Sequence, residues 1–264
     1  MKYLTALLIF FGLTLYHSTQ AQTLHFIIAT DTQHPDTATA ASCRADSAKM
    51  QKEALEMRNG SGYPLKLYFI TGPDYNAENL KAKIKTVSAA PGDIVWVYIS
   101  GNAACSKNEK DSTQMKNRWL APGKSPDKKV STDELLAEIE AKNARLNVMI
   151  VNTCALIRNI PSIAGNRGDA ERKIYRSLLS ARGTVRIFSS ECSEYSYADV
   201  KGGLFTNVFL EILDHYIASG RQSLSWKELE HDVCPTTNQR CRSRIFRPQH
   251  PQFFYTNGFI DNRP

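Results

Sequence analysis

The sequence has no long apolar run beyond its first residues, which excludes a membrane protein with several spans. It also has no long block of like charge, and because 42% of its residues are hydrophobic, a disordered chain is excluded as well. No internal repeat is present. The remaining explanation is an ordinary chain of 264 residues, long enough to bury a sizeable core in one globular domain.

Several motifs of cofactor and metal chemistry are missing too. No GxGxxG or GxSxG string occurs, which argues against a dinucleotide-binding fold and against a serine hydrolase. No cysteine and histidine cluster has zinc spacing, so we expect no metal and no cofactor. The net charge of +7 is modest and scattered, and no aromatic-plus-basic motif accompanies it, so we expect no nucleic-acid partner.

The N-terminus has the parts of a secretory signal peptide. Lys2 gives a cationic start, an apolar segment runs from Tyr3 to Tyr16, and small and polar residues follow up to Ala21. The apolar segment is shorter than the roughly 20 residues that span a bilayer. We therefore expect cleavage after Ala21, export to the outside or to a bacterial periplasm, and a single domain over residues 22–264 with no integral membrane segment.

Export makes disulfides permissible among the six cysteines. Cys234 and Cys241 are close enough in sequence to close a small loop, and the other pairings cannot be deduced from spacing. The others are Cys43, Cys105, Cys154 and Cys192.

Apolar runs bounded by turn residues alternate with segments of helical period. This pattern predicts strands at 24–30, 64–70, 93–99, 145–151, 184–188 and 252–255, and helices at 42–57, 76–87, 131–142, 205–217 and after a cap at 225–228. A polar insertion separates the third strand from the third helix. The alternation predicts an α/β fold with three αβα layers, a mostly parallel sheet of about six strands and helices on both faces.

In such sheets ligands bind at the carboxyl ends of the strands. The third expected strand ends in YISGNA, at 98–103, and the fourth in IVNTCA, at 150–155. Cys154 therefore lies just past a strand end, where a thiol can act as a nucleophile. The alternative, which Cys154 alone does not exclude, is a small buried apolar side chain.

Taken together, these strings resemble the caspase and metacaspase superfamily of cysteine proteases. In that family the third strand ends in Ser-Gly-His-Gly and the fourth in Asp-x-Cys, and the matching strings here are SGNA and NTC. The similarity continues in SCRAD at 42–46, WLAP at 119–122 followed by STDEL, FSS at 188–190, EYSY at 194–197 and GLFT at 203–206. It covers roughly residues 24 to 255 in the family's order.

The resemblance implies roles for individual residues. Cys154 falls on the nucleophile and Asn102 on the general-base histidine. Four further residues fall on the pocket that in metacaspases receives a basic side chain, namely Cys43, Asp46, Ser100 and Asn152. Asn152 replaces the pocket aspartate, which leaves Asp46 as its remaining carboxylate.

Asn102 is the serious departure from the pattern. A cysteine protease works through the thiolate, and an unperturbed cysteine has a pKa of about 8.5, so only a few per cent is ionised at pH 7. An asparagine amide can donate and accept hydrogen bonds but cannot shuttle a proton near neutrality. General acid–base catalysis is typically worth ~10²–10⁴ in rate. We therefore expect such a site to bind peptide far better than it cleaves it.

These residues are consistent with three functions. The first is an exported pseudoprotease that binds a peptide or protein partner in the former cleft. The second is an active cysteine endopeptidase for Arg/Lys sites, with Cys154 as nucleophile and a substitute base such as His34, which lies on the loop after the first strand. The third is a binding domain of the same sheet class without protease ancestry, and the Asp46 and Cys154 matches speak against it.

The signal peptide gives a first prediction. The exported protein should begin at Gln22 and contain 264 − 21 = 243 residues. N-terminal sequencing and the intact mass of protein recovered outside the cytoplasm would check this. Exported protein that still carries Lys2 would contradict the predicted cleavage.

Overall fold

A computed structural model describes residues 22–105, 118–120, 129–153, 155–156, 169–256 and 258–261. The predicted signal peptide and the predicted nucleophile Cys154 both lie outside these residues. Among the described residues no helix is long and apolar enough to cross a membrane.

The centre of the molecule is a six-stranded sheet in the order β12-β9-β7-β3-β1-β2. The strands are β1 (Leu24–Thr30), β2 (Leu65–Thr71), β3 (Ile94–Gly101), β7 (Leu146–Thr153), β9 (Gly183–Phe188) and β12 (Gln252–Tyr255). All neighbours are parallel except β12, which runs antiparallel to β9. The predicted sheet of about six mostly parallel strands is confirmed.

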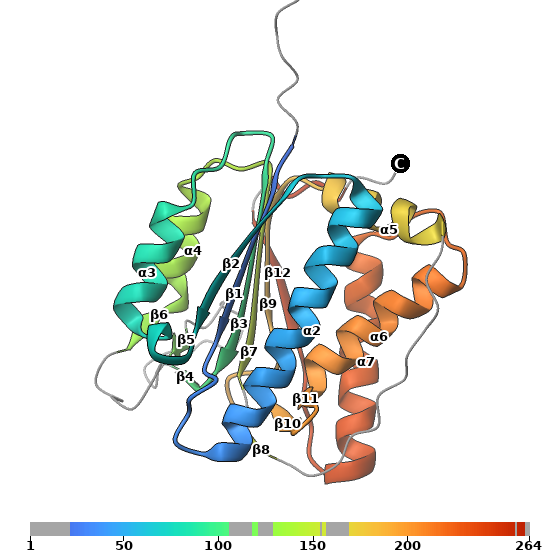
Figure 1. The fold of residues 1–264 in the computed structure, drawn as a ribbon. Coiled ribbons are helices and arrows are strands. Elements are labelled where there is room, and N and C mark those ends of the chain that lie inside the picture. The colour runs from blue at the N-terminus through green and yellow to red at the C-terminus, as the bar shows by residue number, and fades with distance from the viewer. Residues whose placement is uncertain are drawn as a thin grey trace, which may run out of the picture.

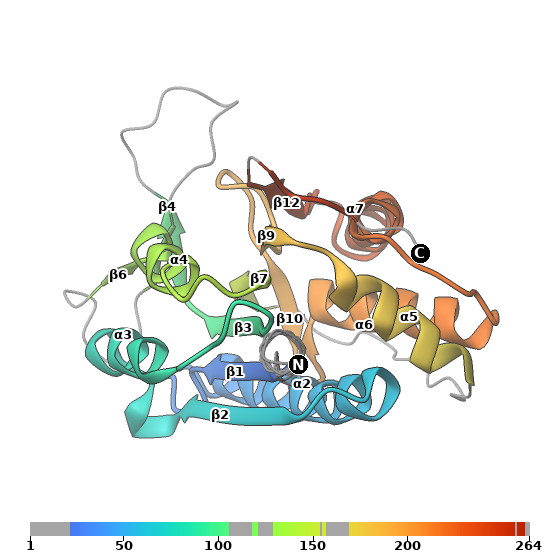
Figure 2. The ribbon, with the colours of Figure 1, turned by 90° about the horizontal axis from the view of Figure 1, so that it is seen from above.

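Helices cover both faces of this sheet, as the sequence predicts (Figure 1). One face carries α3 (Ala77–Thr86) and α4 (Thr132–Glu140), and the other carries α2 (Thr37–Ser61), α5 (Asp169–Ser180), α6 (Leu204–Ala218) and α7 (Trp226–Ile245). A short 3₁₀ turn, η1 (Gly72–Asp74), joins β2 to α3. Seen from above, the two helical layers enclose the twisted sheet between them (Figure 2).

Two small sheets lie at the carboxyl ends of the central strands. One consists of β4 (Ala103–Cys105), β5 (Arg118–Leu120) and β6 (Val130–Ser131), and the other of β8 (Ala155–Leu156), β10 (Tyr197–Asp199) and β11 (Gly202–Gly203). None of these six short strands was predicted from the sequence, because segments of two or three residues are too short to show a hydrophobic period. The polar insertion therefore contributes strands at both of its ends.

The helix bounds depend on capping residues. α2 begins five residues earlier than predicted, because the Asp36 carboxylate accepts from the backbone N–H of Thr39 at 2.7 Å. It ends at Ser61, and its C-cap is Gly62, whose positive φ of 78° suits glycine. α5 was not predicted, although Ile174, Leu178 and their neighbours on one face are buried.

The disulfide expectation needs correction. Cys234 and Cys241 are both free thiols on α7. They lie seven residues apart on a helix, about 10 Å along its axis, which is beyond the span of a disulfide. The disulfide in the described part of the chain instead joins Cys105, after β3, to Cys192, after β9.

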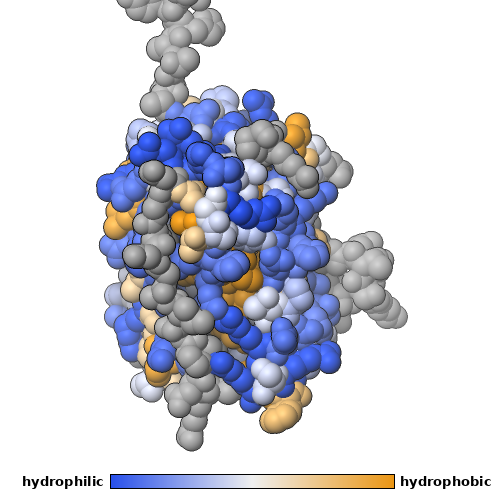
Figure 3. Space-filling view, turned by 90° about the vertical axis from the view of Figure 1, so that its right-hand side faces the viewer, coloured by the Kyte–Doolittle hydropathy of each residue, from blue (hydrophilic) through white to orange (hydrophobic). Residues whose placement is uncertain are grey.

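Two apolar cores lie on the two faces of the sheet. In the larger core, under α2, α5 and α6, the Trp96 ring stacks on Phe26 and contacts Trp226, with centroids 5.5 Å apart in both pairs. The Trp226 indole N–H donates to the carbonyl of Leu178 at 3.0 Å, whereas the buried Trp96 Nε1 has no partner. The outer surface of this helical layer is mostly hydrophilic (Figure 3).

These two indoles form a matched pair for a stability test. Trp226→Phe removes the hydrogen bond to the Leu178 carbonyl, whereas Trp96→Phe removes an unpaired donor. Since a buried hydrogen bond is worth about 1 kcal/mol, Trp226→Phe should lower the free energy of unfolding by about 1 kcal/mol more than Trp96→Phe. Urea denaturation of both variants measures the difference, and equal losses would contradict it.

Candidate functional site

The parallel register brings the ends of the central strands to one edge. Thr30 of β1 lies opposite Ser100 of β3, and Ser100 lies opposite Asn152 of β7. On the other side, Val151 of β7 pairs with Phe188 at the end of β9. The loops that follow these strands therefore share the edge at which the sequence predicts the site.

A buried polar cluster lies beneath this edge on the α2 side. The Asp46 carboxylate accepts from the Ser100 hydroxyl and from the Asn152 amide, both at 2.8 Å, and from the backbone N–H of Gly203 at 2.9 Å. The Cys43 thiol lies 3.6 Å from the hydroxyl oxygen of Ser100. α2, β3, β7 and β11 thus meet at one carboxylate.

Further hydroxyl groups extend the cluster. The Asn152 amide also donates to Tyr98 Oη at 3.3 Å, and Tyr98 Oη lies 2.7 Å from Thr206 Oγ1. The Ser196 hydroxyl donates to Asn152 Oδ1 at 3.3 Å. Both ends of the Asn152 amide therefore have partners inside the protein.

The β11 backbone closes this cluster. A Cβ on Gly202 would lie 2.4 Å from Asp46 Oδ1, and a Cβ on Gly203 would lie 2.1 Å from Asn152 Nδ2. Only glycine lets the chain approach so closely. Gly202 also has a positive φ of 106°, which favours glycine for a second reason.

Burial raises the pKa of the Asp46 carboxyl, and hydrogen bonds from Gly203 and Ser100 oppose this effect. Lys49 lies one turn further along α2, and its ammonium donates to the carbonyl of Lys201 and to Asn207 Oδ1. Burial lowers the pKa of Lys49, while the charges of Asp46 and Asp199 act in the opposite direction. A cation of the chain itself thus accompanies the buried carboxylate.

The four residues predicted to bind a basic side chain are therefore brought together. All four, Cys43, Asp46, Ser100 and Asn152, are 0% exposed. In this conformation a substrate could reach Asp46 only if the Gly202–Gly203 segment moved aside. Their role in substrate binding remains a prediction.

Asn102 and His34 lie side by side at the edge. Asn102 follows β3, His34 follows β1, and His34 Nε2 lies 2.6 Å from the Asn102 side-chain amide. His34 Nδ1 accepts from the backbone N–H of Asp36 at 3.0 Å. Gly101, the last residue of β3, has no room for a side chain, because a Cβ there would lie 2.6 Å from Tyr75 Oη.

These contacts fix the imidazole tautomer. Because Nδ1 of His34 accepts a hydrogen bond, the proton of a neutral ring is on Nε2. Nε2 must then donate to Asn102, so the carboxamide oxygen faces it, which is the flipped orientation of the amide. Both His34 nitrogens are thus engaged, and neither offers a free lone pair as a general base.

A second histidine at this edge has a different arrangement. His250, just before β12, has its Nδ1 2.5 Å from Glu194 Oε1, and its backbone N–H donates to Glu194 Oε2 at 2.6 Å. A carboxylate on Nδ1 orients an imidazole and directs Nε2 outward. This pair was not predicted from the sequence, because the two residues are 56 positions apart and only the fold brings them together.

The Cys105–Cys192 disulfide crosses the same edge. Cys105 ends β4, which follows β3, and Cys192 follows β9, so the bond joins the two segments on either side of β7. Because Cys105 and Cys192 are bonded to each other, neither offers a free thiol to pair with Cys154.

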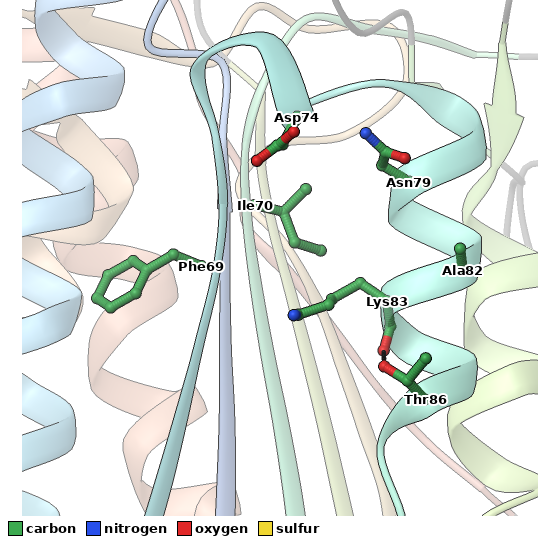
Figure 4. A pocket seen from close by; sticks show the side chains of 7 residues that line it. All are labelled: Phe69, Ile70, Asp74, Asn79, Ala82, Lys83 and Thr86. Atoms are coloured by element: carbon green, nitrogen blue, oxygen red, sulfur yellow. Dashed lines mark hydrogen bonds between the residues drawn. The ribbon is translucent and has the colours of Figure 1, made fainter.

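A separate pocket of about 290 Å³ lies between β2 and α3 (Figure 4). It is lined by Phe69, Ile70, Asp74, Asn79, Ala82, Lys83 and Thr86, and none of the predicted site residues is among them. Within the described residues no group of three or more His, Cys, Asp or Glu side chains could hold a metal ion. The carboxyl edge is therefore the stronger candidate site.

Comparison with solved structures identifies the fold class. Caspase-1 from Spodoptera frugiperda superposes with a TM-score of 0.51 at 15% identity, covering 91% of this chain and 90% of that one. A Geobacter sulfurreducens protein superposes with a TM-score of 0.50 at 13% identity, covering 88% of this chain and 92% of that one. The chain thus has a caspase-like fold.

At these identities the likeness concerns the fold alone. No family model matches the sequence, and no curated protein matches it. The resemblance drawn from the strand-end strings therefore agrees with the fold, and the assignment of Asn102 to the histidine position stays a prediction.

The Asp46 cluster predicts a pH-dependent stability. Asp46→Asn places an amide where three donors converge and should lower the free energy of unfolding, since each unsatisfied buried group costs about 1–3 kcal/mol. Because the folded pKa of Asp46 is raised, its contribution is full below the ordinary value near 4 and is lost as pH rises through the folded pKa. The gap between wild type and variant should therefore shrink toward neutral pH.

Urea denaturation between pH 3.5 and 7.5 measures this gap. Asp74→Asn, at an exposed position of η1, is the matched control and should change the free energy of unfolding little at any pH. A gap for Asp46→Asn that widens as pH rises would contradict the raised pKa.

Proposed function

We propose that this chain is an exported, caspase-like pseudoprotease that binds a peptide or protein partner at the carboxyl edge of its sheet and hydrolyses peptide bonds poorly or not at all. One observation carries the proposal. The residue at the expected general-base position is Asn102, and the imidazole beside it, His34, uses both of its nitrogens in hydrogen bonds.

The closed polar cluster supports the same proposal. An endopeptidase for Arg/Lys sites needs an accessible carboxylate for the substrate cation, whereas Asp46 is 0% exposed and accepts three hydrogen bonds from within the chain. Because this carboxylate is buried and already accepts three hydrogen bonds, it is poorly placed to bind the cation of a substrate. Burial of Asp46 therefore favours binding elsewhere along the edge over cleavage after a basic residue.

The Cys105–Cys192 disulfide supports export, because disulfides persist in oxidising compartments and are rare in the cytosol of mesophiles. Its partners are 87 residues apart in sequence. By loop-closure arguments such a bond stabilises a fold by about 4.6 kcal/mol. Proteins outside the cytoplasm commonly gain stability in this way.

The test restores the missing imidazole. Wild-type protein should show no turnover of Arg- and Lys-directed fluorogenic peptides above a Cys154→Ala control. Asn102→His should gain turnover of ~10²-fold or more that Cys154→Ala abolishes, because general acid–base catalysis is worth ~10²–10⁴. Asn102→Ala is the matched control and should stay silent. Wild-type turnover that depends on Cys154 would overturn the proposal.

Alkylation by iodoacetamide measures the reactivity of the Cys154 thiol independently of substrate binding. Cys43 and Cys241 are buried, and burial raises the pKa of Cys241 to about 11 and that of Cys234 to about 12. Labelling at pH 7 therefore reports Cys154. Its rate should rise in Asn102→His if the restored imidazole draws the proton from sulfur, and an unchanged rate would argue against Asn102 at the base position.

One observation favours the second candidate, an active cysteine endopeptidase. The His250–Glu194 pair has the orientation of a catalytic base, with a carboxylate on Nδ1. If wild-type protein proves active, His250→Gln should abolish turnover while His34→Gln retains it. The reverse result would assign the base to His34, the substitute base predicted from the sequence.

A further inference from the structure

A pair of buried arginines lies on the α4 side of the sheet, away from the Asp46 cluster. The Arg118 guanidinium carbon, on β5, is 4.2 Å from the ring centroid of Phe188, and that of Arg186, on β9, is 4.6 Å from it. Two positive charges thus share one aromatic ring at the end of β9.

Arg186 has its charge compensated. Its Nη1 donates to Asp133 Oδ1 at 2.5 Å and its Nη2 to Thr132 Oγ1 at 2.6 Å, both at the start of α4. A carboxylate and a hydroxyl therefore take up this guanidinium. The pair Arg186–Asp133 adds no net charge to the site.

Arg118 has no such compensation. Its Nη2 donates to the Ser190 carbonyl and its Nη1 to Thr153 Oγ1 at 3.4 Å, both uncharged acceptors. Its Nε has no hydrogen-bond partner, and neither has the buried hydroxyl of Ser190. Among the residues that the structure describes, no carboxylate forms an ion pair with Arg118.

An uncompensated charge in this position is costly. Arg118 is only 3% exposed, and removing an ion from water costs several kcal/mol unless an opposite charge compensates it. Burial, and then the charge of Arg186, lower the pKa of Arg118 to about 10. At neutral pH the guanidinium nevertheless stays charged, so the site retains one positive charge.

We propose that Arg118 and Ser190 form a carboxylate-binding site, in which the Nε–H of Arg118 and the Ser190 hydroxyl donate to the oxygens of a bound carboxylate. The charged Nε–H can form a charge-assisted hydrogen bond with one carboxylate oxygen, and the Ser190 hydroxyl is a second donor for the other oxygen. One net positive charge balances one carboxylate, whereas a phosphate dianion would leave an excess negative charge. The Phe188 ring supports the guanidinium from one side.

The site lies at the carboxyl edge of the sheet. Ser190 follows β9 and Thr153 ends β7, so both acceptors of Arg118 belong to the carboxyl edge. A peptide bound along this edge could supply the carboxylate from an acidic side chain or from its C-terminus. The proposal depends on the arginine geometry alone, so it can fail or hold whether or not the chain cleaves peptides.

The arginine Nε–Hε resonances test the site directly. In ¹⁵N-labelled exported protein, the Arg118 cross-peak is the one that disappears in Arg118→Lys. Sodium acetate, titrated at constant ionic strength against sodium chloride, should shift this cross-peak along a saturating curve. No shift, or a shift equal to that in chloride alone, would overturn the proposal.

Ser190→Ala provides a variant that should fold normally, because it removes a buried hydroxyl without a partner. It should weaken acetate binding about 5-fold, the equivalent of one hydrogen bond. Arg242→Gln removes a positive charge from an exposed position of α7, and as a control for non-specific electrostatic attraction it should leave acetate binding unchanged. An unchanged affinity in Ser190→Ala would contradict the proposed site.

Three short acetylated peptides then separate the sources of the carboxylate. One has an internal aspartate and an amidated end, one is neutral with a free C-terminus, and one is neutral and amidated. Either of the first two should shift the Arg118 cross-peak at lower concentration than acetate, and the third should not. Tighter binding of sodium phosphate than of acetate would overturn the choice of a carboxylate.

Discussion

The buried carboxylate of Asp46 is the constraint on which the candidate site depends. It lies on α2 and accepts hydrogen bonds from β3, β7 and β11, so four segments distant in sequence must take fixed positions to satisfy it. A buried carboxylate without these donors would be prohibitively costly. The two glycines of β11 follow from the same requirement, because a side chain at either position would occupy the space of the donors.

This constraint changes what a caspase-like fold can do. The residues at the predicted specificity pocket bind one another instead of facing solvent, and Lys49 places a cation of the chain itself near the carboxylate. The polar groups that remain accessible are at the edge, where His34 meets Asn102 and Glu194 holds His250. The candidate site therefore lies at the ends of the strands, above the buried cluster.

The Cys105–Cys192 disulfide and Arg118 act on the same edge from the other side. The disulfide joins the segments that follow β3 and β9, and Arg118 bonds to residues at the ends of β7 and β9. Loops are ordinarily the most mobile parts of a fold. Here the Cys105–Cys192 disulfide and the Arg118 guanidinium restrain the loops on either side of β7, the strand that precedes Cys154.

The sequence alone determined the sheet. Residues 24–30 and 252–255 were predicted to their exact bounds, and the alternation of strands and helices predicted the three layers, because hydrophobic period is a local property of the chain. The strand-end strings also identified the edge, and the resemblance to the caspase and metacaspase superfamily implied that Cys43, Asp46, Ser100 and Asn152 share one pocket.

Only the tertiary structure decided what these residues contact. The pairing of Cys105 with Cys192, the closure of the Asp46 cluster by β11, the engagement of His34 with Asn102 and the uncompensated charge of Arg118 all join segments far apart in the chain. Spacing carries no information about such contacts, since burial and hydrogen-bond partners are set by packing between elements. Cys234 and Cys241 illustrate the same point. They are close in sequence, but both lie on α7, and seven residues of helix hold them too far apart for a disulfide.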